Sequence, residues 1–345
     1  MALLKLESTD AFVVRDFDDE VPALGIVRSA PKILQSGAKE LARSQTYQCA
    51  VFDMKIQGAS AGVNAAPEDR DAALAGFCRE LLPLASSGAL LLDPGKGVDD
   101  AGLADLFAAD PRGEAARAVV EGLSNVAHLT GLGAVACAEA VGALDGKKIA
   151  IDNYEGNGPA VARAASERGA KVVAISTADG AVVNTAGFDV AGLEEAWAAH
   201  GSAMLGEVAD EVLPGNRLLG ADVDVLFAGS KMGLVNHHGA PFVKASLLVP
   251  TGPIPYTTKG ALVLEAQGTT VLPDSVAAAG GMFASMPPTI EGQAALDASV
   301  VDLIGTLTGL IIGREQMPIL EACHRAESFL KTWRDELPFG RPFAA

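Results

Sequence analysis

Cysteine, aromatic residues and clusters of positive charge are all scarce in this chain of 345 residues. Its four cysteines have no CxxC or other metal-ligand spacing, which argues against a disulfide framework and predicts buried thiols. The 26 Lys and Arg are outnumbered by 43 Asp and Glu, giving a formal net charge of −17, and they form no basic block. Because a phosphate backbone is bound by clustered cations, no nucleic-acid partner is expected.

The sequence also has little that would target it to a membrane. Residues Met1–Glu7 become acidic too early for a signal peptide. The most apolar later stretch, Val300–Ile312, is short and contains Asp302. These features predict a cytoplasmic protein with no membrane partner.

Two familiar catalytic signatures are missing as well. No G-x-S-x-G sequence occurs between a strand and a helix, which argues against a serine hydrolase. The adjacent His237 and His238 have no third ligand at a spacing suited to zinc, so no metal is expected.

The composition that remains is that of an ordinary globular protein with room for two domains, because 49% of the residues are apolar and 20% are charged. Residues 10–110 combine a helical pattern at Arg70–Leu84 with short apolar runs, which predicts a small α/β domain with a mixed sheet. The runs are Ala11–Val14, Ala50–Ile56 and Gly88–Leu92.

From Leu144 onward, strand-like runs alternate with helices, and each run is followed by Gly, Pro, Ser or Asn. The runs are Lys148–Asp152, Lys171–Ser176, Val223–Ala228, Ser246–Pro250 and Thr269–Leu272. This alternation predicts a Rossmann-like, doubly wound parallel sheet. Two helical stretches follow, Gln293–Gly313 and Met317–Arg334.

The predicted fold is therefore α/β, with three parts. Residues 1–130 form an N-terminal domain, and residues 131–290 form a nucleotide-binding-type domain. Residues 291–345 are helices that we expect to return to the first domain, with Gln293–Gly313 making that connection. A ligand site is expected in a cleft between the domains.

The segment from Lys147 to Gly158 predicts the opening of a dinucleotide-binding βαβ unit. A strand, a tight turn and a helix are followed by a second strand at Ala170–Ser176. The turn, however, has Asn153 and Glu155 where such a unit usually has glycine.

Six segments, taken in order, carry a resemblance to a known family: Thr46–Val51, Gln57–Val63, Asp93–Asp100, Leu129–Gly133, Leu144–Asp189 and Asp222–Gly281. Together they resemble the glutamate/leucine/phenylalanine/valine dehydrogenase family, which deaminates amino acids oxidatively with NAD(P). The resemblance implies a two-domain fold, a small-molecule substrate and a homo-oligomer, with substrate binding and oligomerisation assigned to residues 1–130.

On the substrate side, the resemblance places the catalytic carboxylate on Asp93, while the two family lysines fall on Gln48 and Ser60. A turn-forming role for Asp93 is the alternative. Without those cations, ordinary amino-acid deamination is not expected. Lys231 or Lys55 could replace the lost charge, although solvated loop lysines are the simpler interpretation of both. Further substrate-binding positions implied by the resemblance are Gly25, Arg28, Lys96 and Ala278.

On the cofactor side, only Gly158 survives of the three fingerprint glycines, and Glu155 places negative charge where a pyrophosphate would sit. Binding of NAD(P) is therefore an open question, because Glu155 is either a relic of lost binding or a new ligand for a ribose or an amine. The full set of implied cofactor positions is Thr130, Asn153, Glu155, Gly156, Gly158, Thr177, Ser230 and Gly252.

Three functions remain open from the sequence. The first is an NAD(P)-dependent oxidoreductase acting on a small amino or hydroxy acid. The second is a non-redox enzyme that hydrolyses, eliminates or condenses an amine-bearing substrate after losing NAD(P) binding. The third is a catalytically silent binding subunit.

Overall fold

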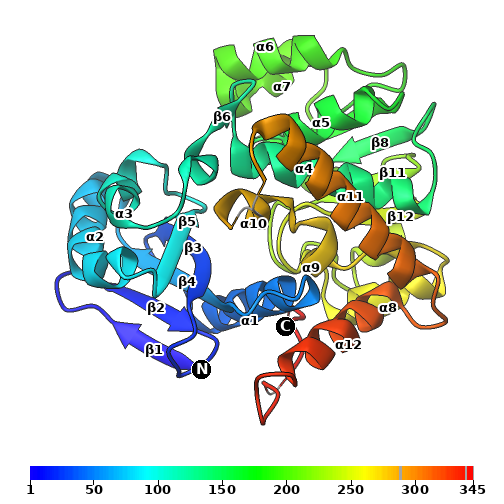
Figure 1. The fold of residues 1–345 in the computed structure, drawn as a ribbon. Coiled ribbons are helices and arrows are strands. Elements are labelled where there is room, and N and C mark those ends of the chain that lie inside the picture. The colour runs from blue at the N-terminus through cyan, green and yellow to red at the C-terminus, as the bar shows by residue number, and fades with distance from the viewer. Residues whose placement is uncertain (287–289, 339, 345) are drawn as a thin grey trace. The chain divides into compact units, whose positions relative to one another are not determined.

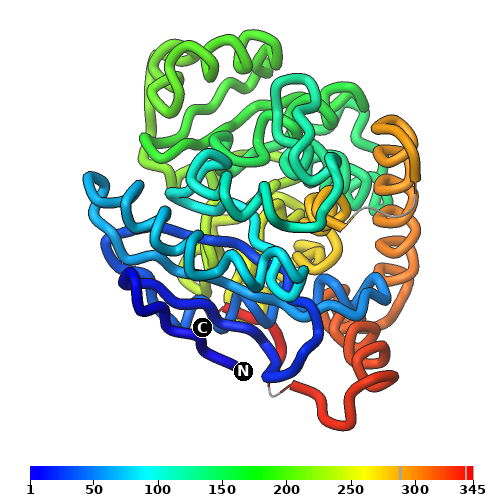
Figure 2. Tube along the Cα trace, turned by 60° about the vertical axis from the view of Figure 1, so that its left-hand side comes forward, coloured from blue at the N-terminus to red at the C-terminus, as the bar shows by residue number. Residues whose placement is uncertain are grey.

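The computed structural model describes residues 1–286, 290–338 and 340–344. The chain folds into two compact units (Figures 1 and 2). Unit 1 contains residues 1–113 and 323–342, and unit 2 contains residues 114–322 and 343–345. We predicted a first boundary near residue 130, whereas the contacts divide the chain between residues 113 and 114.

Unit 1 is built on a five-stranded sheet in the order β1-β2-β4-β3-β5. Strands β3, β4 and β5 are parallel to one another, while β1 and β2 are antiparallel to their neighbours. The bounds are β1 Ala2–Lys5, β2 Ala11–Arg15, β3 Ala23–Ala30, β4 Gln57–Asn64 and β5 Leu90–Pro94. The predicted mixed sheet is thus confirmed, but the apolar run 50–56 is a helix end and a turn rather than a strand.

Helices cover both faces of this sheet. On one face, α2 (Arg70–Ser86) and α3 (Ala104–Ala109) bury a core that includes Val27, Ala61, Phe77 and Leu92. On the other face, α1 (Gln35–Val51) packs on β2 and β4 through small side chains such as Ala38 and Ala42. Glycine at position 58 lets α1 approach closely, since a Cβ there would lie 1.8 Å from the Ala42 carbonyl oxygen.

Unit 2 contains a six-stranded sheet in the order β10-β9-β8-β11-β12-β13. The five strands expected from the sequence are present and parallel, which confirms the Rossmann-like fold. The sequence did not reveal β10, which closes one edge of the sheet in the antiparallel direction. The bounds are β8 Lys148–Ile151, β9 Lys171–Thr177, β10 Gly180–Val183, β11 Val225–Ala228, β12 Leu247–Pro250 and β13 Thr270–Val271; a small hairpin, β6 Val119–Val120 and β7 Leu123–Ser124, precedes them.

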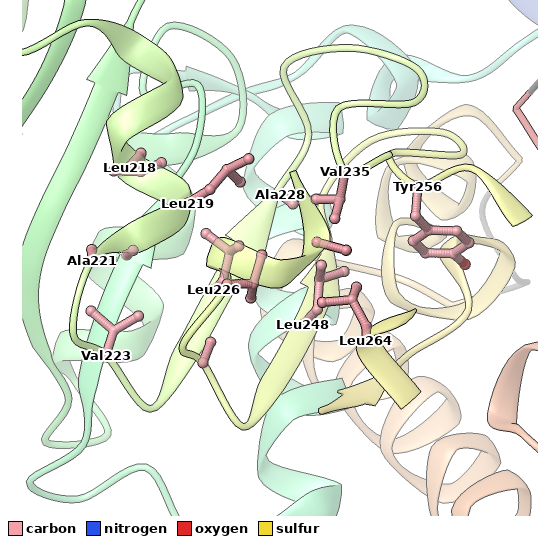
Figure 3. Close-up of a cluster of buried hydrophobic side chains, with 14 of the residues drawn as sticks. Leu218, Leu219, Ala221, Val223, Leu226, Ala228, Val235, Leu248, Tyr256 and Leu264 are labelled. Atoms are coloured by element: carbon pink, nitrogen blue, oxygen red, sulfur yellow. The ribbon is translucent and has the colours of Figure 1, made fainter. Parts of the chain in front are cut away.

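The helices of unit 2 begin at side-chain caps in several places, as at Ser124, Asp189 and Thr257. Their bounds are α4 Asn125–Val141, α5 Gly158–Ser166, α6 Val190–His200, α7 Leu205–Val208, α8 Thr258–Ala266, α9 Asp274–Ala277 and α10 Gly280–Ser285. Leu226 of β11 and Leu248 of β12 belong to a cluster of buried side chains that also contains Tyr256 and Leu264 (Figure 3).

Helix α11 (Gln293–Ile312) runs along α4 within unit 2 (Figure 1). We expected it to return to the first domain, but the return comes later, within α12 (Pro318–Leu330), where residues from Cys323 onward belong to unit 1. Among the described residues, α11 is the one helix whose length and composition would allow a membrane span, with 33% of its most apolar window buried. Those properties alone are weak grounds for a membrane segment.

Candidate functional site

The parallel strands of unit 1 present a polar strip on the face where α1 lies. Ile26 of β3 is in register with Ser60 of β4 on one side and with Asp93 of β5 on the other. Side chains of paired residues point to the same face, so Ser60, Ile26 and Asp93 form one row. Arg28 lies two residues further along β3, about 7 Å away. Helix α1 covers β2 and β4, while Ile26, Arg28 and Asp93 stay partly exposed.

Asp93 is held by a cation, Arg112, that no sequence motif singles out. The Arg112 guanidinium forms an ion pair with Asp93, a second one with Asp110 at 2.7 Å, and donates to the Leu92 carbonyl oxygen at 2.9 Å. The Arg112 side chain is only 2% exposed, against 14% for Asp93. Burial by itself would lower the pKa of Arg112, but the charges of Asp93 and Asp110 outweigh it and raise that pKa. Asp93 therefore lies at the strand end as a paired carboxylate.

Arg28 and Ser60 have buried polar atoms without partners. Nε and Nη2 of Arg28, and Oγ of Ser60, are inaccessible to water and lack a hydrogen-bond partner among the described residues. Burial lowers the pKa of Arg28 below its usual value. Such groups are costly unless something binds them, so this strip is a candidate ligand site.

The remaining substrate positions in unit 1 have mainly backbone or supporting contacts. Gly25 lies tightly against β4, where a Cβ would be 1.9 Å from the Ala59 carbonyl oxygen. Gln48 lies half-buried on α1 and accepts a hydrogen bond from Gln45 at 2.8 Å. Lys96 is exposed, and its carbonyl oxygen accepts a hydrogen bond from the Ser29 N–H at 3.0 Å.

Lys55 lies in a different part of unit 1 from Asp93. It precedes the first residue of β4, at the amino edge of the parallel strands, whereas Asp93 lies near their carboxyl edge. Its ammonium group is 5.4 Å from the centre of the Trp333 ring, and both residues line a surface cavity of about 460 Å³ with Arg334. The structure therefore does not bring Lys55 to the polar strip.

In unit 2, the strand order reverses between β8 and β11, which is where open α/β sheets bind ligands. Asp152 follows β8 at this point and is buried. Its carboxylate accepts hydrogen bonds from the N–H groups of Gly229 and Ser230 at 3.1 and 2.7 Å, and from the Ser176 hydroxyl at 3.2 Å. Asp152 thus ties together the ends of β8, β9 and β11.

The turn after β8 has two backbone features of a dinucleotide-binding loop despite its altered sequence. Asn153 has a φ of +70°, the left-handed conformation that the first glycine would otherwise supply and that Asn tolerates well. Gly158 performs the third glycine's role, since a Cβ there would lie 2.9 Å from the Asn153 carbonyl oxygen. Gly156 lies against the Asn153 side chain, and the Asn157 amide donates to the Thr251 carbonyl oxygen at 2.7 Å.

Glu155 directs its carboxylate to the end of β9. Its Oε1 accepts a hydrogen bond from the Ala178 N–H at 2.6 Å. Thr177 donates its hydroxyl to the Ser202 carbonyl oxygen at 3.0 Å, and Asp179 accepts from the Ser202 hydroxyl at 2.7 Å. Glu155 is therefore the carboxylate that the loop itself supplies at the position expected for a ribose ligand.

The loops after β11 and β12 meet through two glycines. A Cβ on Gly229 would lie 2.3 Å from the Thr251 hydroxyl, and one on Gly252 would lie 2.7 Å from the Gly229 carbonyl oxygen. Ser230 contributes its N–H to Asp152, and the next residue, Lys231, is exposed.

The other two implied positions in unit 2 lie close to helix ends. Thr130 is buried in α4 and donates its hydroxyl to the Val126 carbonyl oxygen at 2.7 Å. Ala278 ends α9 and is partly buried. Across residues 1–286, 290–338 and 340–344, no group of three or more His, Cys, Asp or Glu could hold a metal ion.

Arg112 and Asp152 are the two functional candidates that sequence reasoning missed. Arg112 is separated from Asp93 by 19 residues without a recognisable spacing, so only the folded chain reveals the pair. Asp152 could have been noticed, because a carboxylate directly after the apolar strand Ile149–Ile151 lies at the carboxyl edge of a parallel sheet.

Known structures share this architecture at low sequence identity. A hetero-hexameric glutamate dehydrogenase from Thermus thermophilus, in a leucine-bound form, aligns with a TM-score of 0.79 at 20% identity over 97% of this chain and 90% of its own. An L-tryptophan dehydrogenase from Nostoc punctiforme aligns with a TM-score of 0.63 at 19% identity over 96% and 95%. At these identities the likeness establishes the fold, which is that of amino-acid dehydrogenases.

Sequence comparison identifies the family. The sequence model of the Glutamate/Leucine/Phenylalanine/Valine dehydrogenase family matches residues 122–295, half of the chain, and the protein belongs to this family of oxidoreductases. An NAD-specific glutamate dehydrogenase A from Halobacterium salinarum is 28% identical over 290 residues, 76% of this chain and 65% of its own length. An NADP-specific glutamate dehydrogenase from Saccharolobus shibatae is 29% identical over 163 residues, 46% of this chain and 38% of its own length.

Proposed function

We propose that the protein is an NAD(P)-dependent oxidoreductase that oxidises a small 2-substituted carboxylic acid, and that it acts on hydroxy acids in preference to amino acids. The observation that carries this proposal is the pairing of Asp93 with Arg112 in the same row as the neutral Ser60. A base is present at the strip, while the ammonium group needed for imine chemistry is absent from position 60.

The residues of unit 1 supply what oxidation of an alcohol requires. Asp93 is a carboxylate at the carboxyl end of β5 and can accept the proton from a substrate hydroxyl, as a general base does. The C–H electron pair leaves as hydride, and the hydroxyl becomes a carbonyl. A bound nicotinamide would accept that hydride. Deamination would also need stabilisation of a carbinolamine by a nearby cation, and Ser60 cannot provide it.

The turn between β8 and α5 supports binding of a dinucleotide. The left-handed Asn153 and the close approach at Gly158 preserve the backbone path that presents N–H groups to a pyrophosphate. Glu155 binds the Ala178 N–H, which directs its carboxylate toward β9. Together with Thr130, these residues would hold the cofactor.

A non-redox enzyme is the second candidate, because Asp152 and Glu155 already accept hydrogen bonds from Gly229, Ser230 and Ala178. These backbone N–H groups at the carboxyl ends of the strands are therefore already bound within the protein and are not free to bind a nucleotide. In that case Asp93 would act as an acid or base on the same class of substrate without a nucleotide.

Calorimetric titration with NAD⁺, NADH, NADP⁺ and NADPH tests the redox function, followed by turnover assays on matched pairs of hydroxy and amino acids. Suitable pairs are lactate and alanine, 2-hydroxyisocaproate and leucine, and phenyllactate and phenylalanine. We expect micromolar binding of one nucleotide, about −8 kcal/mol, and faster turnover of the hydroxy acid in the preferred pair.

Asp93→Asn should abolish this turnover while the fold persists. The control is Asp100→Asn, the same substitution at an exposed aspartate nearby, and it should leave turnover intact. Absence of nucleotide binding at millimolar concentration would refute the redox function and favour the non-redox candidate. Full activity of Asp93→Asn would remove that residue from the mechanism.

We further propose that the protein assembles as a homo-oligomer in the cytoplasm, in keeping with the hexameric state of the Thermus thermophilus relative. Light scattering on the purified protein measures this directly, and a monomeric mass would contradict it.

A further inference from the structure

Arg28 of β3 is half-buried in unit 1, and one edge of its guanidinium group is buried without a partner among the described residues. Its Nε and Nη2 atoms are inaccessible to water and have no hydrogen-bond acceptor among the described residues. A buried cation without an anion or other acceptor is one of the costliest arrangements in a protein interior, and burial accordingly lowers the pKa of Arg28. With an apolar side chain at this position, the ligand-free fold should therefore be at least as stable.

The surrounding backbone leaves space for this side chain. Arg28 is in register with Gly62 of β4, and a Cβ on Gly95 of the β5 loop would lie 3.2 Å from the Arg28 Cγ and 3.4 Å from the Ile26 Cδ1. Arg28 and Ile26 thus lie over a position that has no side chain. The Arg28 stem leans toward the same strand end that presents Asp93.

The two unpartnered nitrogens define the shape of the missing partner. Nε–H and Nη2–H lie on one edge of the planar guanidinium and donate in parallel. That edge matches the two oxygens of a carboxylate in a bidentate pair. A neutral hydroxyl or amide would satisfy only one of these donors and would leave the charge uncompensated.

We propose that Arg28 binds the carboxylate of the substrate and takes over the anchoring role of the lysine that is absent at Gln48. The proposal rests on the proposed function in that the ligand is a small carboxylic acid. With its carboxylate on Arg28, a 2-substituted acid extends along β3 toward the row of Ser60, Ile26 and Asp93. The reacting carbon then lies within reach of the Asp93 carboxylate.

The test combines ligand binding with thermal unfolding of the full chain, and it needs neither cofactor nor turnover. Wild type and Arg28→Met are titrated with phenyllactate, 2-hydroxyisocaproate and malate, and with the neutral amides of the first two. We expect at least one acid to bind wild type, its amide to bind at least tenfold more weakly, and Arg28→Met to lose about 10- to 100-fold in affinity for the acid. Arg28→Lys should retain part of the affinity, because it keeps the charge but not the paired donors.

Ligand-free stability provides an independent readout. Arg28→Met should unfold at the same or a higher temperature than wild type, because it removes a half-buried cation for which the described residues offer no acceptor. Arg79→Met, on the exposed side of α2, is the matched control and should change neither binding nor unfolding.

Three results would overturn the role of Arg28: unchanged acid affinity in Arg28→Met, a lower unfolding temperature of that variant, or failure of every acid to bind wild type. These outcomes are separable from failure of the proposed function. Acid binding that depends on Arg28 without any nucleotide binding would keep this inference and refute the oxidoreductase. Turnover that is insensitive to Arg28→Met would keep the oxidoreductase and refute the role of Arg28.

Discussion

Replacing Arg112 with leucine should strongly destabilise unit 1. The Arg112 and Asp110 side chains are each only 2% exposed, so the substitution would leave the Asp110 carboxylate buried after losing a 2.7 Å ion pair. Removing one partner of a buried pair costs about 3–5 kcal/mol. A buried leucine returns about 1.5 kcal/mol of hydrophobic stabilisation, so the net loss should be about 1.5–3.5 kcal/mol.

Urea unfolding can report this loss for unit 1 alone. The chain has two tryptophans, of which Trp333 belongs to unit 1 and Trp197 to unit 2. In a Trp197→Phe background, fluorescence therefore follows unit 1. Arg112→Leu should shift the midpoint without a large change in slope, since a change in stability alone moves the midpoint.

A double-mutant cycle checks the cause of the destabilisation. Asp110→Asn removes the charge that loses its ion pair in Arg112→Leu. The free-energy loss of the double variant should therefore be smaller than the sum of the two single losses by about 1.5 kcal/mol or more. A loss below about 1 kcal/mol for Arg112→Leu would refute the reasoning. Additive single losses would show that the two side chains act independently.

Three further outcomes follow from particular contacts. Gly280→Ala should lower the stability of unit 2 by about 3 kcal/mol or more in calorimetry, because its Cβ would lie 1.8 Å from the Leu129 carbonyl oxygen; a loss under about 1 kcal/mol would contradict this packing. Glu155→Gly should weaken nucleotide binding about tenfold by titration, since it removes the carboxylate that the Ala178 N–H holds at the expected ribose position; unchanged or tighter binding would show that this carboxylate does not hold the cofactor. The hydrogen bond from Arg341 lowers the pKa of Glu327 below its usual value of 4.5, although partial burial opposes this shift. The ionised Glu327 therefore stabilises the fold above pH 4.5, and this stabilisation is lost as the pH falls through the lowered pKa of the folded state. Unfolding temperatures measured from pH 6 to pH 3 should therefore fall less steeply for Glu327→Gln, and identical profiles would remove this group from the acid response.

Local chemistry made much of unit 2 predictable. The strands at Lys148–Ile151 and Lys171–Thr177 are apolar runs between turn-forming residues, and a buried parallel strand needs little more than that pattern. The short edge strand Gly180–Val183 escaped notice because it follows β9 after only two residues and pairs back on it. The strand Ala23–Ala30 was missed because Gly25, Arg28 and Ser29 interrupt its apolar run.

Some residues of the candidate site could also be judged from the sequence, while others needed the structure. Asp93 could be selected from the sequence because it ends an apolar run, and Asn153 and Gly158 because they occupy a recognisable turn. Lys55 could not be excluded, since only the register of β4 shows that it precedes the strand at the opposite edge from Asp93.

The sequence by itself determined the fold class and the family, because hydrophobic periodicity and turn residues act over a few neighbouring positions and survive in the linear order. Only the tertiary structure decided which charges meet. It paired Arg112 with Asp93 and Asp110, joined Asp152 to the loop after β11, and left Nε and Nη2 of Arg28 without an acceptor among the residues that the structure describes. These contacts depend on strand register and loop path, which bring together residues whose separation along the chain carries no signal.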